Sequence, residues 1–265
     1  MAANTERCTV CGGTGWAVST REGVEFVVRC ACRGAVSAER VLRACRIPSR
    51  YRHCTIEGFE VWSSLPESRR QQFNARRRTR EFVDLYPGVE RGLLFMGSVG
   101  TGKTHLAVAA LRELAFVKGL RGLYVNAVDL VQQLQISFDG GGPSREAILG
   151  PVTDADVLVL DEVGTGRLTD WVRDLLYYVI NSRYMARRLT IVTTNYRDET
   201  PARPAGPQNL DAVVAVPRPP DRYEETLADR ISERLRSRLH EMCDVVELYG
   251  EDYRARRSAR PGSPR

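Results

Sequence analysis

Eight consecutive residues near the middle of the chain have the types and spacing needed to hold a phosphate chain. They fit G-x-x-x-x-G-K-[ST] and run Gly97, Ser98, Val99, Gly100, Thr101, Gly102, Lys103 and Thr104. In this pattern glycines let backbone N–H groups point inward, the lysine adds a positive charge for the β and γ phosphates, and the threonine hydroxyl is offered to Mg²⁺. We therefore predict a nucleotide site here and include His105, the next residue, in it.

Two adjacent carboxylates offer the chemistry of hydrolysis. Asp161 and Glu162 follow the apolar run 157–160, so Asp161 would hold the Mg²⁺ shell while Glu162 orients and deprotonates the attacking water. Asn195 ends the next apolar run and would emerge at the same sheet edge, within reach of the γ-phosphate or the water. The alternative interpretations are a buried strand that ends in surface acids and a turn-forming asparagine.

Four cysteines near the N-terminus form two close pairs, Cys8 with Cys11 and Cys30 with Cys32. Four thiols suit tetrahedral Zn²⁺, and zinc would supply the folding energy that this segment, poor in apolar residues, lacks. Reduced non-ligating cysteines or a redox pair are the alternatives, because the second pair is C-x-C rather than C-x-x-C. The chain start lacks the pattern of a secretory signal, so we expect a reducing, cytoplasmic setting in which metal binding is favoured over disulfides.

The elements that position these residues follow from the hydrophobic pattern. Apolar runs expected to be strands lie at residues 93–96, 122–126, 156–160, 189–193 and 244–248, and segments of helical period separate them. Strands joined by helices imply parallel pairing. We therefore expect an α/β fold, a P-loop core whose parallel sheet is sandwiched by helices, preceded by a small zinc-binding domain.

The same pattern suggests how the chain divides. We expect a zinc-binding N-terminal module at residues 1–45, a linker and first helix at 46–90, the ATPase domain at 91–254 and a disordered basic tail at 255–265. Residues 197–222 carry six prolines and are expected to form a long surface loop or a partly disordered insertion. Residues 224–241 have helical period, with arginines on one face and Ile231, Leu235 and Leu239 on the other.

Composition limits the possible classes of protein. The chain has 43% hydrophobic and 27% charged residues and no apolar run near 18 residues, as expected of a soluble protein. The net charge of +6 is concentrated at residues 69–80 and 254–265, which permits a polyanionic partner without requiring one. A solvated helix face is the favoured interpretation of the first run. The single cysteines, Cys45, Cys54 and Cys243, are expected in the core, and His53, His105 and His240 form no evident ligand set.

Several of these motifs together resemble one family. Gly-Lys-Thr-His-Leu-Ala at 102–107, Leu-Asp-Glu-Val-Gly at 160–164, Thr-Thr-Asn at 193–195 and Gly-Glu-Asp-Tyr-Arg at 250–254 are similar to motifs of the DnaC/DnaI/IstB family of AAA+ ATPases. Residues 46–52 resemble the short element that precedes the ATPase core of this family. The cysteine-rich start resembles the zinc-binding N-terminal domain of DnaI-like helicase loaders.

This resemblance implies a function and a set of site residues. It implies binding of a replicative hexameric, DnaB-type helicase through the N-terminal part and of single-stranded DNA through an ATP-dependent homo-oligomer, with ATP, Mg²⁺ and Zn²⁺ bound. It also implies that Arg238, or else Arg234, reaches the nucleotide of the next subunit, that Arg254 contacts the phosphates of its own subunit, and that Asn195 is the sensor 1 residue. The chain departs from many relatives in having Glu162 where they carry Asp, and in the length of its proline-rich segment.

Three other functions remain open from the sequence. An IstB-like transposition helper ATPase shares the core but activates a transposase on duplex DNA. A small-molecule P-loop kinase would need a substrate lid that we do not find, and a non-hydrolysing adaptor would use ATP only to lock a binding surface. The cysteine module favours the helicase loader over the transposition helper, because its partner there would be a helicase.

Overall fold

The computed structural model describes residues 9–10, 16–21, 24–29, 39–198 and 225–258. Near the N-terminus, β1 (Trp16–Arg21) and β2 (Val24–Arg29) pair antiparallel. Residues 39–44 are helical and lead, through the short η1 (Ser49–Tyr51), to the helix α2 (Pro66–Asp84). None of the helices that the structure describes is long and apolar enough to cross a membrane.

A five-stranded parallel sheet forms the core, as the sequence predicted. Its strands are β3 (Gly92–Met96), β4 (Gly122–Asn126), β5 (Val157–Asp161), β6 (Leu189–Thr194) and β7 (Cys243–Glu247), each within one residue of the predicted run. Their spatial order is β4-β5-β6-β3-β7. Because β6 lies between β3 and β5, the segments that leave the carboxyl ends of these three strands meet at one edge of the sheet.

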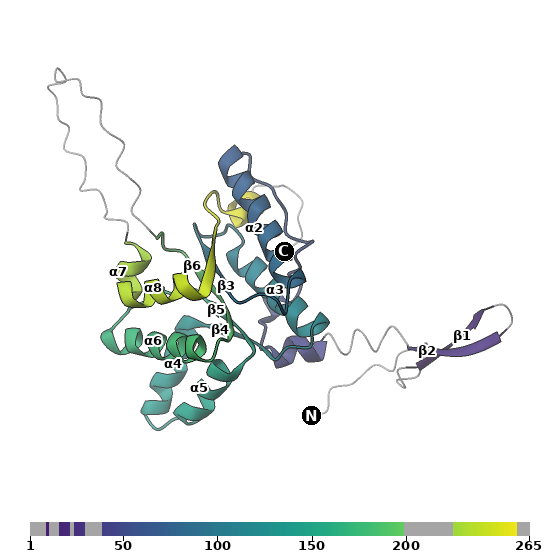
Figure 1. The fold of residues 1–265 in the computed structure, drawn as a ribbon, viewed down its shortest axis with the longest axis horizontal. Helices are drawn as coiled ribbons and strands as arrows, with labels where there is room; N and C mark the ends of the chain where they lie inside the picture. Colours follow the sequence, from purple (N-terminus) through teal and green to yellow (C-terminus); the bar gives the residue numbers. More distant parts are fainter. Residues whose placement is uncertain (1–8, 11–15, 22–23, 30–38, 199–224, 259–265) are drawn as a thin grey trace, which may run out of the picture.

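Helices cover both faces of the sheet (Figure 1). Alternate residues of a strand point to opposite faces, so each strand serves two cores. Leu94, Leu158 and Val192 pack against one set of helices, which comprises α4 (Ala127–Phe138), α5 (Arg145–Asp154), α6 (Asp170–Met185), α7 (Leu227–Ile231) and α8 (Glu233–Met242). Phe95 and Val159 face α2 and α3 (Lys103–Val117) on the other side. This arrangement confirms the predicted parallel sheet sandwiched by helices.

The C-terminal helical stretch differs from the prediction. We expected one helix across residues 224–241, but α7 ends and α8 begins at Ser232, whose φ is +86°. The break has a tertiary cause, because the carbonyl of Arg230 accepts a hydrogen bond from Arg173 Nε at 3.2 Å instead of continuing the helix. The apolar face expected here, Ile231, Leu235 and Leu239, is buried as predicted. After β7, the tail expected from residue 255 begins inside the short helix α9 (Tyr253–Ser258).

A buried arginine ties α5 and α6 to the sheet. Arg183 has no exposed surface, and it donates hydrogen bonds to the carbonyls of Val152 (3.0 Å), Ala155 (2.8 Å) and Leu189 (2.6 Å). Two of these carbonyls lie at the C-terminal end of α5, where a cation opposes the helix dipole. Burial lowers the pKa of Arg183 to about 10, so the guanidinium stays charged at pH 7.

We predict that Arg183→Met lowers the free energy of unfolding by about 3 kcal/mol, because several buried carbonyls lose their donor at once. Urea denaturation followed by circular dichroism measures the change. Met185→Ala is the matched control on the same helix, since Met185 is 71% exposed and should cost little. Equal stability of the Arg183 variant and the native chain would show that Arg183 is not an anchor.

Candidate nucleotide site

The phosphate loop joins β3 to α3 in a conformation that requires glycine. Gly97, Gly100 and Gly102 have φ values of +148°, +77° and +101°. The first two are also too crowded for a side chain. A Cβ at Gly97 would lie 1.9 Å from the carbonyl oxygen of Leu248, and one at Gly100 would lie 1.9 Å from a carboxylate oxygen of Asp252. These glycines therefore allow both the left-handed turn of the loop and the close approach of the C-terminal segment.

Lys103 begins α3 and turns its side chain back into the loop. Its Nζ donates to the carbonyl oxygens of Gly97 at 2.8 Å and Ser98 at 2.6 Å, and the residue is only 6% exposed. Burial lowers the pKa of Lys103 to about 8, although Asp161 nearby opposes the shift. The ammonium is therefore charged at pH 7 and enclosed by the loop.

Asp161 is buried at the end of β5 and accepts three hydroxyl hydrogen bonds. Oδ1 accepts from Thr104 Oγ1 at 2.8 Å and from Thr193 Oγ1 at 2.6 Å, and Oδ2 accepts from Tyr124 OH at 2.7 Å. Burial raises the pKa of Asp161, and the three hydroxyls act against that rise. The Thr104 hydroxyl and the Asp161 carboxylate are adjacent oxygen donors of the kind that Mg²⁺ prefers, so these residues fit the metal.

Glu162 follows with φ of +61°, a conformation that is unfavourable for a residue with a side chain. Its backbone N–H donates to Thr193 Oγ1 at 2.9 Å, and its Oε2 accepts from Asn126 Nδ2 at 3.0 Å. Asn126 also caps α4, because its Oδ1 accepts from the backbone N–H of Val128 at 2.9 Å. Asn126 thus connects the first turn of α4 to the second acid. Asn126 was not predicted from the sequence, although a polar residue between an apolar run and a helical segment was a usable signal.

Most of the expected nucleotide residues line one cavity of about 470 Å³, to which Gly97, Ser98 and Asp161 contribute no lining. The phosphate-loop residues Val99 to Thr104 and His105 form one wall, and Glu162 and Asn195 lie on the sheet side. An aromatic wall that the sequence did not predict comes from the segment before α2 and from α9, and its members are Tyr51, His53, Phe59, Trp62 and Tyr253. His105 is fixed there, with its Nε2 2.8 Å from the carbonyl oxygen of Thr55. This volume and mixed lining are those of a small-molecule site.

The three arginines expected to act on the phosphates lie in two places. Arg254 lines the cavity from α9. Arg234 and Arg238 lie outside the cavity on α8, with their guanidinium carbons 4.3 Å and 4.1 Å from the ring centres of Tyr177 and Tyr184 in α6. The structure therefore places Arg254 at the nucleotide cavity and the other two arginines outside it.

The zinc prediction falls on residues that the structure does not describe. Cys8, Cys11, Cys30 and Cys32 all lie in those segments. Among the described residues, no group of three or more His, Cys, Asp or Glu side chains is arranged to hold a metal ion. Cys45, Cys54 and Cys243 are buried as predicted, and burial raises the pKa of the Cys54 thiol to about 11.

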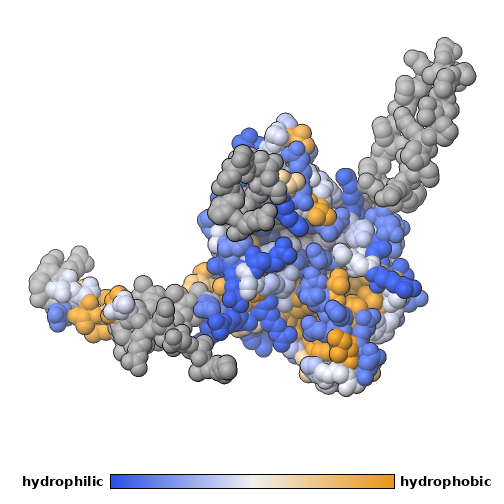
Figure 2. Space-filling view, turned by 180° about the vertical axis from the view of Figure 1, so that it is seen from behind, coloured by the Kyte–Doolittle hydropathy of each residue, from blue (hydrophilic) through white to orange (hydrophobic). Residues whose placement is uncertain are grey.

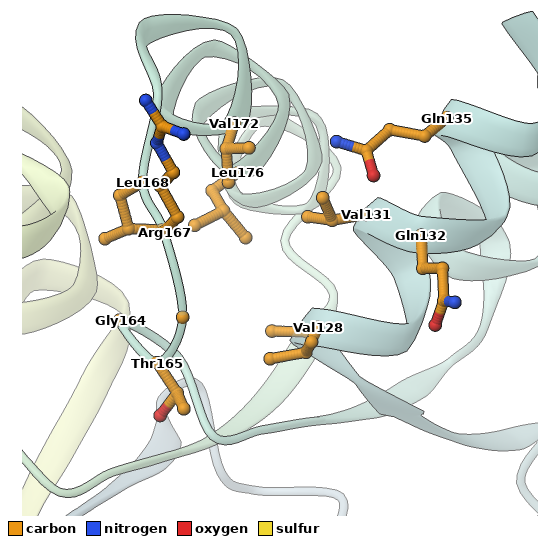
Figure 3. Close-up of a pocket in the computed structure, with 12 residues that line it drawn as sticks. Val128, Val131, Gln132, Gln135, Gly164, Thr165, Arg167, Leu168, Val172 and Leu176 are labelled. Carbon is orange, nitrogen blue, oxygen red and sulfur yellow. The ribbon is translucent and has the colours of Figure 1, made fainter.

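A second cavity, of about 330 Å³, lies between α4, α6 and residues 164–168 (Figure 3). Val128 and Val131 of α4 face Leu168 and Leu176 across it, and the remaining lining includes Gln132, Gln135, Arg167 and Val172. Figure 2 shows apolar side chains gathered on the lobe that contains α4 to α6. The groove begins two residues after Glu162, and α4 begins next to Asn126. This cavity, called the groove between α4 and α6 below, was not predicted from the sequence, and its lining lies close along the chain to Glu162 and Asn126.

The strand order, the glycine loop and the paired acids define a P-loop ATPase with the AAA+ fold. A family model described as IstB-like ATP binding protein matches residues 10–200. The chain therefore belongs to the DnaC/DnaI/IstB-like family of AAA+ ATPases, and it is an ATP hydrolase of that family.

Individual relatives agree with this assignment. The replicative helicase loader DnaC of Escherichia coli (strain K12) is 26% identical over 177 residues, which are 67% of this chain and 69% of DnaC. A crystal structure of the DnaC helicase loader is 32% identical with a TM-score of 0.58, and the match covers 76% of this chain and 99% of that one. The phage-like element PBSX protein XkdC of Bacillus subtilis is 24% identical over 257 residues, 93% of this chain and 84% of XkdC.

We predict that ATP affinity falls as the pH rises above about 8, the pKa of Lys103 in the free protein. Phosphates bind the protonated ammonium and raise its pKa, so affinity is constant below pH 8 and then falls by up to about tenfold per pH unit. Fluorescence titration with an ATP analogue in EDTA, between about pH 7 and pH 9.5, measures this. Lys103→Arg is the control, because guanidinium does not titrate in that range. A flat profile for the native chain would contradict the prediction.

Proposed function

We propose that this ATPase loads a DnaB-type replicative helicase onto single-stranded DNA, with ATP binding and hydrolysis controlling assembly and release. The observation that carries the proposal is the likeness to the DnaC helicase loader, which extends over 99% of that crystallised chain. The N-terminal cysteine module, held by Zn²⁺ through Cys8, Cys11, Cys30 and Cys32, is proposed as the part that contacts the helicase.

Each residue of the nucleotide cavity has a proposed role. Lys103 binds the β and γ phosphates, and Thr104 and Asp161 hold Mg²⁺, which neutralises charge on the phosphate oxygens when bound. Glu162 orients the attacking water and accepts its proton. Asn195 contacts the γ-phosphate or this water. Arg254 contacts the phosphates from the same subunit, which its position in the cavity wall supports.

Arg238, with Arg234 as the alternative, is proposed to act on the nucleotide of a neighbouring subunit. Two observations support an action in trans. Both side chains lie on α8 outside the cavity of their own subunit, and each is held against a tyrosine ring of α6. An arginine held in place by a ring loses less side-chain entropy when it docks. In this proposal each subunit binds its own nucleotide and presents an arginine to the nucleotide of another subunit.

The groove between α4 and α6 is the proposed contact for single-stranded DNA. Exposed aromatic side chains lie on the same two helices, Phe138 on α4 and Trp171 and Tyr178 on α6. Phe138 and Trp171 have ring centres 5.7 Å apart, and Arg145 lies 5.8 Å from the ring centre of Tyr178. Aromatic faces stack unpaired bases regardless of sequence, and the amides of Gln132 and Gln135 can hydrogen-bond base edges. DNA bound here would contact α4, whose first turn is capped by Asn126, the hydrogen-bond partner of Glu162.

The arginine run of α2 is a weaker candidate for the DNA contact. Four of its arginines pair with acids of the same chain, and the pairs are Arg70 with Glu67, Arg77 with Glu81, Arg78 with Asp244 and Arg80 with Glu113. These pairs neutralise much of the charge that a phosphate backbone would need. They support the interpretation of the run as a solvated, ion-paired helix face.

An IstB-like transposition helper is the alternative function, because the matching family model is described as IstB-like ATP binding protein. We predict that full-length protein, used as bait in a lysate of its native host with ATP and zinc, retains a replicative helicase. The double variant Cys8→Ser/Cys11→Ser should lose both bound zinc and the helicase, whereas Lys103→Ala should keep its zinc. Mass spectrometry identifies the retained proteins. Recovery of a transposase without a helicase would replace the loader with the transposition helper.

We predict that Arg238→Ala slows DNA-stimulated ATP hydrolysis on the order of 10³-fold and leaves ATP affinity unchanged, because an arginine supplied in trans acts on the transition state. Mixing Arg238→Ala with Lys103→Ala subunits should restore part of the rate, since the first supplies intact nucleotide sites and the second supplies the arginine. Phosphate release measures hydrolysis. Arg234→Ala is the comparison, and loss of activity in that variant alone would move the role to Arg234.

A further inference from the structure

The two carboxylate oxygens of Asp161 accept hydrogen bonds from different neighbours. Oδ1 faces the phosphate loop and accepts from Thr104 and Thr193, whereas Oδ2 accepts from Tyr124. Thr104 is the residue expected to turn its hydroxyl to Mg²⁺, and Thr193 Oγ1 also accepts the backbone N–H of Glu162. Of these three hydroxyls, that of Tyr124 is the one that neither bonds Glu162 nor is expected at the metal.

The sheet register explains why a tyrosine can reach this carboxylate. Asn126 pairs with Asp161 across β4 and β5, so Tyr124 lies two positions behind the carboxylate along the neighbouring strand. Two positions are about 6.6 Å at the rise of a β-strand, which is close to the length of a tyrosine side chain. Tyr124 packs on the α3 face of the sheet with Val157 and Val159, and Asp161 continues the same alternation. A shorter hydroxyl at position 124 would not reach.

The phenol lies in a protected environment. Tyr124 is 7% exposed and Asp161 is 1% exposed, so water does not compete freely for their hydrogen bond. The segment before α2 covers this side, because the carbonyl of Cys45 accepts from the Tyr124 N–H at 2.8 Å and the Tyr51 ring centre lies 6.2 Å from that of Tyr124. Burial raises the pKa of Tyr124, so the phenol keeps its proton and remains a donor.

We propose that Tyr124 is a positioning residue for the Mg²⁺ site, whose hydroxyl fixes Asp161 Oδ2 and thereby keeps Oδ1 facing Thr104. Residues that hydrogen-bond a metal-binding carboxylate orient it, and their loss typically weakens metal affinity 10- to 100-fold. The proposal rests on the magnesium roles of Thr104 and Asp161 proposed above. It does not depend on the helicase, the DNA or the arginines of α8.

The test is Tyr124→Phe, which removes the hydroxyl and keeps the ring. We expect the Mg²⁺ concentration for half-maximal enhancement of ATP-analogue binding to rise about tenfold, while analogue affinity in EDTA stays unchanged. Hydrolysis should fall at low Mg²⁺ and recover at high Mg²⁺. A purely structural defect would not be rescued by the metal.

Two further variants keep the outcome interpretable. Tyr86→Phe removes a tyrosine hydroxyl from the segment that follows α2, outside the nucleotide cavity, and should leave the Mg²⁺ titration unchanged. Tyr124→Leu removes the ring as well and should also lower the melting temperature, which separates packing from positioning. An unchanged Mg²⁺ titration in Tyr124→Phe, or an equal loss of binding in EDTA, overturns the proposal. Retention of a helicase by the native chain is measured separately, so either proposal can fail alone.

Discussion

A carboxylate with almost no solvent exposure needs hydrogen-bond donors, and here they come from several elements of the sheet and the helices beside it. Asp161 is buried at the end of β5, and an ion in that position is tolerated only when hydrogen bonds replace its lost water. The replacements come from three elements, with Thr104 on α3, Tyr124 on β4 and Thr193 on β6. They converge only when β5 lies between β4 and β6 and when the strands keep their register. The strand order is therefore a condition for this site as well as for the core.

The parts of the site that the sequence predicted are those encoded in contiguous residues. The phosphate loop has its glycines, lysine and threonine in one run, and the acids follow one apolar strand, so no knowledge of tertiary structure was needed. The hydrogen bonds from Tyr124 to Asp161 and from Asn126 to Glu162 were missed because both depend on which strand neighbours β5. That neighbour follows from packing across the sheet, and the period of a single segment carries no information about it.

The helix break at Ser232 was missed for a related reason. The local pattern of residues 224–241 is helical throughout, and its buried face was predicted correctly. The interruption arises because Arg173, on α6, captures the carbonyl of Arg230, while Arg230 itself donates to the carbonyl of Gly164 at 2.9 Å. Residues 164–168, which line the groove, are thus hydrogen-bonded to α7, the helix directly before the arginines of α8. Side chains distant in sequence decided where the helix ended, and they also join the regions proposed to meet DNA and the next subunit.

The close packing of Gly97 and Gly100 affects how mutants of this protein should be interpreted. Alanine at either glycine would collide with the segment after β7, at Leu248 or Asp252, in addition to distorting the loop. Such a mutation would cause two defects that a genetic screen could not separate, because lost nucleotide binding and a displaced C-terminal segment would give the same null phenotype. Lys103 is the better choice for a clean knockout, since its side chain can be shortened without displacing backbone.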